Sequence, residues 1–412
     1  MNGNAVSVNA ARLAARTAEL SAIGGNGTAV TRLGLSVEEQ RARDLVGGWL
    51  RTRGASIRRD AAANLWARFG GAGPAIVVGS HLDSVPSGGR FDGALGVLCA
   101  VEAVEAILDA GGVFRRPVEV VGWCDEEGAR FGIGLFGSCA AFGRLPDGAA
   151  QRADRDGVTI AAALRALGET GDPVHARRAP ADIGADIAAY LELHIEQGPR
   201  LADRGIALGV VSDIVGILHA RVTVRGRQDH AGATIMTARA DALAAAAEMI
   251  VAVESIAGGL PDAVGTVGEI AVRPNAKNVV PGECVFSLDL RARSEETVEA
   301  LGREVRAAIR RVGDARGVTS AIDVLSRVPA VPLDPALRDL FLRSGRAVGV
   351  SAPELFSGAG HDAENAQLAG VRTGMLFVRS TGGSHNPNEL ATDADAALGA
   401  QALALAIAEL AA

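Results

Sequence analysis

The residues of this chain that could do chemistry begin with a histidine at the end of an apolar run. His81 closes AIVVGSH (75–81), and Asp83 and Asp92 follow, the latter in a glycine-flanked turn. A neutral imidazole nitrogen can bind a metal ion, while an acid two residues further along an extended chain can accept the hydrogen of the other ring nitrogen. The carboxylate of Asp92 could bridge two cations. Taken one at a time, these residues also fit a solvated loop or a helix N-cap.

Three consecutive acids follow a second apolar run, VEVVGWC (118–124). Asp125, Glu126 and Glu127 would repel one another at a strand end unless one is protonated or a cation is present. Neighbouring glutamates can divide the work, since one can bind a metal ion while the next acts as a general base. A solvated acidic loop is the alternative, but the buried strand in front of the acids favours a metal site.

Two further histidines occupy comparable places. His194 lies in LELHIEQG with Glu196 two residues on, and His385 lies in the loop STGGSHNPNE after the apolar run 371–378. Each could instead be an ordinary core or loop histidine. Together with the acids they make a nitrogen and oxygen donor set that suits two divalent ions, with Zn, Mn, Co and Ni all acceptable. Two such ions about 3.5–4 Å apart would lower the pKa of a shared water toward ~7.

Strands and helices must alternate to bring these residues together. The runs 75–81, 118–124 and 190–197 have the continuous apolar pattern of buried strands, and 93–108 is a periodic helix between the first two. Ligands bind at the carboxyl ends of such strands. We therefore expect an α/β fold with a mixed sheet and flanking helices. The other elements expected around this sheet are helices 8–23, 37–53, 335–348 and 393–411 and strands 56–60, 64–69 and 371–378.

A different pattern occupies the middle of the chain. Its segments read in order as β-α-β-β-α-β, the pattern of a ferredoxin-like α+β domain. They are 218–226, 237–258, 264–273, 284–292, 296–312 and 319–325. After this block, the alternation of helices and apolar strands returns in 330–412, a stretch too short to fold alone. We expect 1–212 and 330–412 to form one catalytic domain and 213–329 to be inserted in it.

Composition argues against several classes of protein. The 412 residues carry a net charge of −7 and are 48% hydrophobic but only 3% aromatic, which argues against a nucleic-acid binder. No run approaches the roughly 18 apolar residues of a membrane span, and the N-terminus lacks the charged start and apolar run of a signal peptide. The cysteines stand singly, as reduced thiols of a cytoplasmic protein do. They are Cys99, Cys124, Cys139 and Cys284.

Motifs spread over nearly the whole chain resemble the amidase/hydantoinase/carbamoylase branch of the M20 metallopeptidase family. They are GSHLDSVPSGGRFDGALGV, DEEGARFG, ELHIEQGP, DHAGAT, KNVVPGE, LDLRAR, SGAGHDA and GGSHNPNE. The resemblance implies a catalytic domain with two divalent metal ions and an inserted lid and dimerisation domain, hence a homodimer. It also implies a small substrate with a ureido group and a carboxylate: an N-carbamoyl-L-amino acid, N-carbamoyl-β-alanine or allantoate.

The same resemblance implies a role for each matching residue. The implied metal ligands are His81, Asp92 and His194 for one ion, and Asp92, Glu127 and His385 for the other. Glu126 would be the general base. Many peptidase relatives carry a carboxylate ligand at the place of His194, which favours the ureido-cleaving branch over the dipeptidases.

Substrate contacts are also implied by the resemblance. His230 in QDHAGAT would polarise the scissile carbonyl, reaching over from the partner subunit. Asn278 and Arg291 would bind substrate, with Arg291 making a bidentate contact to a carboxylate. An arginine at a strand end is otherwise an ordinary solvated charge. Gln197 and Gly360 would add further contacts.

The remaining histidines are expected to have structural roles. His361 and Asp362, in SGAGHDA, would support the metal site without binding an ion. His175 is expected to be solvated, and His219 to be either a hydrogen-bonded histidine of a strand or an edge-strand histidine. The expected reaction is hydrolysis of an N-carbamoyl-L-amino acid to the amino acid, ammonia and carbon dioxide. Allantoate or carbamoyl-β-alanine hydrolysis is the alternative, and a di- or aminopeptidase a more distant one. The complete ligand set argues against a binding protein without activity.

Overall fold

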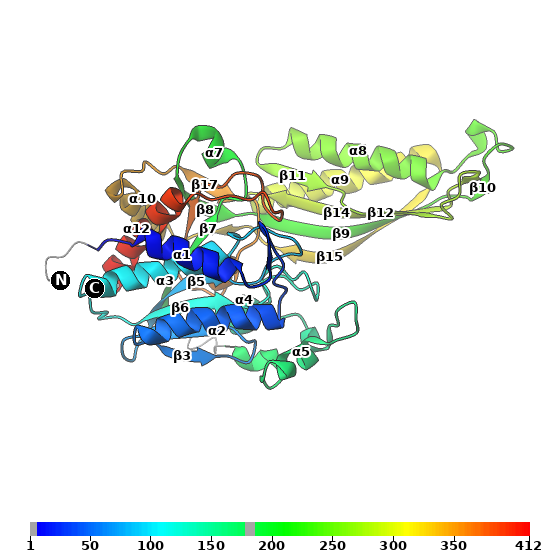
Figure 1. Cartoon of the computed structure of the whole chain (residues 1–412). Helices are drawn as coiled ribbons and strands as arrows, with labels where there is room; N and C mark the ends of the chain where they lie inside the picture. The colour runs from blue at the N-terminus through cyan, green and yellow to red at the C-terminus, as the bar shows by residue number, and fades with distance from the viewer. Residues whose placement is uncertain (1–5, 178–185) are drawn as a thin grey trace. The chain divides into compact units, whose positions relative to one another are not determined.

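The computed structural model describes residues 6–177 and 186–412 (Figure 1). The chain divides into two compact units. Unit 1 comprises Met1–Ser212, Leu333–Leu355 and Gly360–Ala412, and unit 2 comprises Asp213–Pro332 and Phe356–Ala359.

A nine-stranded mixed sheet runs through unit 1, in the order β16-β8-β18-β7-β5-β6-β4-β3 with β17 beside β8. Its central strands are parallel and buried along nearly their whole length: β18 (Thr373–Val378), β7 (Ile187–Ile195), β5 (Ala75–His81) and β6 (Val118–Trp123). Their continuous apolar runs are typical of parallel strands covered on both faces. The outer strands are β3 (Ser56–Arg59), β4 (Leu65–Phe69), β8 (Leu208–Ile214), β16 (Val331–Pro332) and β17 (Glu354–Ser357). The sequence-based expectation of a mixed α/β sheet is confirmed.

One helix is central to the position of the functional loops. α3 (Ala94–Asp109) follows β5 and is buried on almost every side. At Gly96 a Cβ atom would lie 2.1 Å from the Leu193 carbonyl oxygen, so a glycine allows α3 to pack directly on β7. Within residues 6–177 and 186–412, the other α-helices of unit 1 are α1 (Ala10–Ser21), α2 (Val37–Thr52), α4 (Phe136–Ala141), α5 (Ile160–Ala166), α7 (Arg200–Arg204), α10 (Pro335–Ala347), α11 (Asp362–Leu368) and α12 (Asp393–Leu410).

Unit 2 follows the expected β-α-β-β-α-β order except that the expected second strand is divided in two, and two helices lie over one face of an antiparallel sheet (Figure 1). Its elements are β9 (Gly216–Arg225), α8 (Ala242–Gly259), β11 (Ala263–Thr266), β12 (Ile270–Arg273), β14 (Glu283–Ala292), α9 (Glu295–Arg316) and β15 (Thr319–Val328). The sheet order is β11-β14-β9-β15, and β12 also pairs with β14. A two-stranded ribbon of β10 (Asp229–His230) and β13 (Val279–Val280) extends it.

Two expected elements of unit 2 differ from the structure. The helix expected over 237–258 begins at Ala242, because the Asp241 side chain accepts the N–H groups of Leu243 and Ala244 and so caps it there. The strand expected over 264–273 is two strands, since β11 and β12 are separated by a short break.

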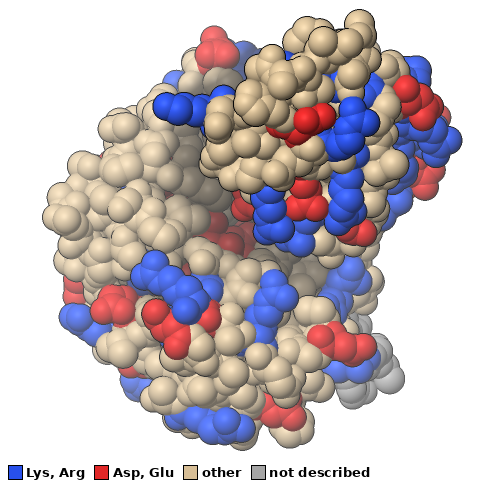
Figure 2. Space-filling view, turned by 90° about the vertical axis from the view of Figure 1, so that its right-hand side faces the viewer, with Lys and Arg blue, Asp and Glu red and all other residues tan. Residues whose placement is uncertain are grey.

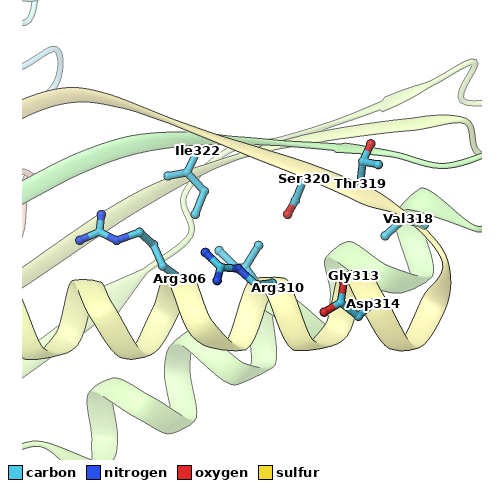
Figure 3. A pocket seen from close by; sticks show the side chains of 9 residues that line it. Arg306, Arg310, Gly313, Asp314, Val318, Thr319, Ser320 and Ile322 are labelled. Atoms are coloured by element: carbon cyan, nitrogen blue, oxygen red, sulfur yellow. The ribbon is translucent and has the colours of Figure 1, made fainter.

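A cavity of about 400 Å³ lies within unit 2 between α9 and β15 (Figure 3). Arg306 and Arg310 of the helix and Ser320 and Ile322 of the strand are among its lining residues. None of the residues expected to act on a substrate lines it.

Among the described residues, one helix, α8, is long and apolar enough by composition to cross a membrane. Its inner face, including Met249 and Val253, belongs to the hydrophobic core of unit 2. Over the face of the molecule in Figure 2, acidic and basic side chains are interspersed, so the net charge of −7 does not form a single acidic field there.

Candidate metal centre

Three neighbouring parallel strands bring the predicted residues to one edge of the unit 1 sheet. β5 ends at His81, β6 leads into the acids from Asp125 onward, and β7 carries His194 near its end. The loop between β5 and α3 supplies Asp92. This turn requires a glycine, because Gly93 has a φ of +61° and a Cβ there would lie 2.2 Å from the His81 Nε2 atom.

His81, Asp92 and His194 form the first group. Oδ1 of Asp92 lies 3.5 Å from His81 Nε2 and 3.1 Å from His194 Nε2. Ligands of one tetrahedral ion at 2.0–2.1 Å from the metal lie about 3.3 Å from one another. The donor atoms of all three residues lie within 4.8 Å of one another, and the side chains are buried. The predicted first ligand set is therefore assembled in space.

Asp92, Glu127 and His385 form the second group. His385 Nε2 lies 3.5 Å from Oδ2 of Asp92 and 3.2 Å from Oε2 of Glu127. The two oxygens of Asp92 thus face different groups, as a bridging carboxylate would. Oε1 of Glu127 is buried without a hydrogen-bond partner among the described residues, an atom for which a cation would be a partner.

The ring of His194 is oriented for metal binding by its neighbours. Its Nδ1 atom lies 2.9 Å from the carbonyl oxygen of Ile195, so that nitrogen carries the hydrogen and donates. Its Nε2 atom accepts the N–H of Gly93 at 3.2 Å. In this tautomer Nε2 carries the lone pair, as a metal ligand must, and it lies 3.1 Å from Oδ1 of Asp92.

Asp83 lies behind the first group and reaches the acidic loop. Its Oδ1 atom lies 3.4 Å from His81 Nδ1, so the expected neighbours are together, although the ring nitrogen makes no hydrogen bond with a described residue. The same oxygen accepts the backbone N–H of Glu126 at 2.9 Å, while the Oδ2 atom accepts that of Glu127 at 3.0 Å. The Glu126 carboxylate lies 3.7 Å from His81 Nε2 and belongs to neither ligand group. This is where a general base would act.

The electrostatics of the centre call for a cation. Burial raises the pKa of Glu126 well above its usual value, although His81 opposes the shift. Burial and the charge of Asp92 raise the pKa of Glu127 to about 8. Burial alone would lower the pKa of His81, but Glu126, Asp83 and Asp92 outweigh it and raise the pKa. Crowded buried acids of this kind, with imidazole nitrogens between them, fit divalent ions.

Asp92 is held by Ser384 and Glu389, to which no role had been predicted from the sequence, and by Gln197, which had been expected to contact the substrate. Its Oδ2 atom accepts hydrogen bonds from the Ser384 hydroxyl at 2.6 Å and from the amide of Gln197 at 2.9 Å. Glu389 accepts the backbone N–H groups of Phe91 and Asp92, both at 3.0 Å. Ser384 and Glu389 lie on either side of His385 in GGSHNPNE. An acid in the same loop as a predicted metal ligand was the feature of the sequence that could have marked Glu389 as part of the centre.

The predicted substrate contacts are divided between the units. Gln197 and Gly360 belong to unit 1, where Gly360 directly precedes His361 and α11, and where Gln197 binds Asp92. His230 and Asn278 are neighbours in unit 2, since the Ala231 N–H donates to the Asn278 carbonyl.

His230 is exposed and has a defined tautomer. Its Nδ1 atom accepts the N–H groups of Gly232 and Ala233 at 2.9 and 3.0 Å. Nε2 therefore carries the ring hydrogen, which suits donation to a carbonyl oxygen.

Arg291 is partly occupied by an acid on its own strand. Its guanidinium makes a bidentate contact with Asp289, at 2.8 Å for each hydrogen bond, and donates to the Gly358 carbonyl at 3.0 Å. Burial would raise the pKa of Asp289, but Arg291 and His219 outweigh it and hold the pKa well below its usual value. Asp289 therefore orients the guanidinium.

Among the remaining histidines, His219 is hydrogen-bonded to Ser326 and lies on an inner strand and not at an edge, since β9 lies between β14 and β15. His361 is buried with its ring 4.5 Å from that of His194, and burial and His194 lower its pKa well below the usual value. His219 lies on β9 beside Asp289 at 3.4 Å, and His175 is exposed.

Comparison with known proteins shows the family. The model of peptidase family M20/M25/M40 matches residues 77–409. An N-carbamoyl-L-amino acid amidohydrolase of Geobacillus stearothermophilus is 39% identical over 399 residues, covering 95% of this chain and 96% of that protein. The allantoate amidohydrolase of Bacillus subtilis is 35% identical and covers 91% of each chain. The crystal structure of a hydantoinase/carbamoylase family amidase from Burkholderia multivorans has a TM-score of 0.89 at 33% identity over 98% of both chains. The chain therefore belongs to peptidase family M20/M25/M40.

Proposed function

We propose that this protein is a metal-dependent amidohydrolase that cleaves the ureido C–N bond of N-carbamoyl-L-amino acids, giving the amino acid, ammonia and carbon dioxide. The observation that carries the proposal is the position of Asp92, whose two oxygens face His194 and His385 separately. The similarity to an N-carbamoyl-L-amino acid amidohydrolase along 95% of the chain supports the substrate class.

The residues of unit 1 would divide the chemistry between binding and proton transfer. His81, Asp92, Glu127, His194 and His385 would hold two divalent ions, with Zn, Mn, Co and Ni as the candidates. The ions supply a water of lowered pKa when bound. Glu126 accepts the proton of that water and passes it to the leaving nitrogen.

Residues of unit 2 would recognise the substrate. Arg291 binds the substrate carboxylate through the face of its guanidinium that Asp289 leaves available. His230 donates from Nε2 to the ureido oxygen, where negative charge develops in the transition state. Asn278, Gln197 and Gly360 complete the contacts in this proposal.

The arrangement within unit 2 supports a homodimer. His230 and Asn278 lie at β10 and β13, which leads directly into β14, whereas Arg291 lies near the far end of β14. The eight residue steps from Glu283 to Arg291 span about 26 Å. One small substrate cannot contact both ends, so we infer that His230 and Asn278 serve the site of a second copy. Unit 2 would be the lid and dimerisation domain. A cytoplasmic location belongs to the same proposal, with four free cysteines in support.

A substrate panel tests the proposal. Protein loaded with Zn²⁺, Mn²⁺, Co²⁺ or Ni²⁺ is assayed with N-carbamoyl-L-amino acids, N-carbamoyl-β-alanine, allantoate and a dipeptide, and the ammonia or amino acid released is measured. We expect the highest kcat/KM with an N-carbamoyl-L-amino acid. Preferential turnover of allantoate would support the alternative suggested by the Bacillus subtilis relative. Turnover of the dipeptide alone would refute ureido hydrolysis.

A further inference from the structure

Glu389 is a buried acid of the metal centre that is not one of the predicted ligands. Its side chain is only 4% exposed, and it lies in the loop between β18 and α12. One oxygen, Oε1, accepts the backbone N–H groups of both Phe91 and Asp92 at 3.0 Å. The acid therefore holds the turn that carries the bridging carboxylate, from a loop nearly 300 residues away in the sequence.

The other oxygen of Glu389 closes a ring of contacts. Oε2 lies 2.7 Å from the hydroxyl of Ser384, which lies 2.6 Å from Oδ2 of Asp92. Glu389 thus binds the backbone of Asp92 directly, and it is linked to the side chain of Asp92 through Ser384. A Cβ at Gly89 would lie 2.1 Å from Oε1, so a glycine makes room for the carboxylate.

The two groups of ligands differ in what holds them. His81 and His194 of the first group stand on strands β5 and β7, and both side chains are 1% exposed. His385 stands on a loop with a φ of +58°, and its side chain is 52% exposed. The Ser384 and Glu389 contacts tie this loop to Asp92. The Ser384 hydroxyl contacts Oδ2, the oxygen that faces His385.

We propose that Glu389 is a positioning residue which, through Ser384, locks the His385 loop to Asp92 and so sets the affinity of the second metal position much more than that of the first. The inference rests on the proposed two-ion centre. It assigns Glu389 a task that is separate from folding: a residue that only stabilised the fold would weaken both positions together.

The test is a titration of the metal-depleted full chain with Co²⁺, followed by calorimetry and by visible absorption. For the wild type we expect two binding events. Glu389→Ala and Ser384→Ala should weaken the second event about 10- to 100-fold, as loss of groups that orient metal ligands does, and leave the first within about threefold. Glu389→Gln, which keeps an oxygen for the two N–H groups, should recover part of the loss.

The first event serves as the internal control for folding, and Ser384→Ala, which deletes a single hydroxyl, answers the question if Glu389→Ala does not fold. Asn388→Ala changes an exposed neighbour in the same loop and should bind as the wild type does. Equal weakening of both events, or none, in Ser384→Ala and Glu389→Ala would overturn the inference alone. A wild type that binds fewer than two ions would overturn it together with the proposed two-ion centre.

Discussion

The side chain of Asp83 accepts the backbone N–H of Glu126 at 2.9 Å. Its second oxygen does the same for Glu127, and its first also faces His81. One carboxylate therefore links the end of β5 to the acidic loop after β6. It sets the place of the proposed general base relative to the metal ligands.

Replacing this carboxylate should disturb the centre more than the fold. Asp83→Asn leaves one acceptor oxygen for the two backbone N–H groups. The N–H group that loses its acceptor then faces the NH₂ of the new amide, which is itself a donor. We expect kcat to fall about 10- to 100-fold. Asp154, which accepts the N–H groups of Asp156 and Val158 in another loop, offers a matched control. Asp154→Asn should keep wild-type kcat, and equal losses in both variants would assign the Asp83 effect to general destabilisation.

Arg291→Ala should act on substrate binding. Loss of a hydrogen bond to a charged group costs about 1.5–3 kcal/mol, so KM for an N-carbamoyl-L-amino acid should rise about 10- to 100-fold. The carboxamide analogue of the same substrate should show no such change. Asp289→Asn should give a smaller rise, because Asp289 orients the guanidinium. An unchanged KM in Arg291→Ala would remove this residue from the site.

Subunit mixing tests whether two copies share each site. Glu126→Gln and His230→Ala should each be nearly inactive alone. A mixed dimer would contain one site with both intact groups, so random mixing should restore about a quarter of wild-type activity. The two variants carry different tags, are recombined, and are purified through both tags, and the activity of the resulting mixed dimer is then measured. No recovery in the doubly tagged dimer would mean that His230 acts within its own chain.

Stability should depend on pH and on metal together. The pKa of Glu127 is raised to about 8, so the metal-free folded chain keeps a proton that the unfolded chain loses near the usual value of 4.5. This acid therefore lowers the stability of the metal-free protein as pH rises from about 4.5 to about 8. A bound cation displaces the proton. The increase in Tm on adding metal should therefore grow from about pH 5 to about pH 8. Calorimetry can measure this increase, and an increase that became smaller over the same range would contradict the raised pKa of Glu127.

The parts of the centre that the sequence predicts are those carried by buried strands. His81, His194 and the acids beginning at Asp125 follow or end continuous apolar runs, and parallel strands place their carboxyl ends at one edge. Local spacing also predicted the contact of Asp83 with His81. Its bonds to Glu126 and Glu127 depend on which strands become neighbours, and no local pattern contains that information.

Some contacts could have been predicted from the sequence but were not. Asp289 and Arg291 are two residues apart on one strand, so their side chains share a face and could have been paired from the sequence. Asp241 offered an N-cap four residues after the expected start of its helix. The link from Glu389 to Asp92 was beyond sequence reasoning, because it joins a loop to a turn that becomes its neighbour only in the folded sheet.

Metal-dependent release of ammonia from an N-carbamoyl-L-amino acid tests the central claim most directly. The chain is depleted of metal, assayed, reloaded with divalent ions and assayed again, beside Glu126→Gln treated identically. We predict no turnover after depletion, recovery on reloading, and a variant that binds metal as the wild type does while kcat falls about 10²- to 10⁴-fold. Full activity of the depleted wild type, or near-normal kcat in Glu126→Gln, would contradict the account.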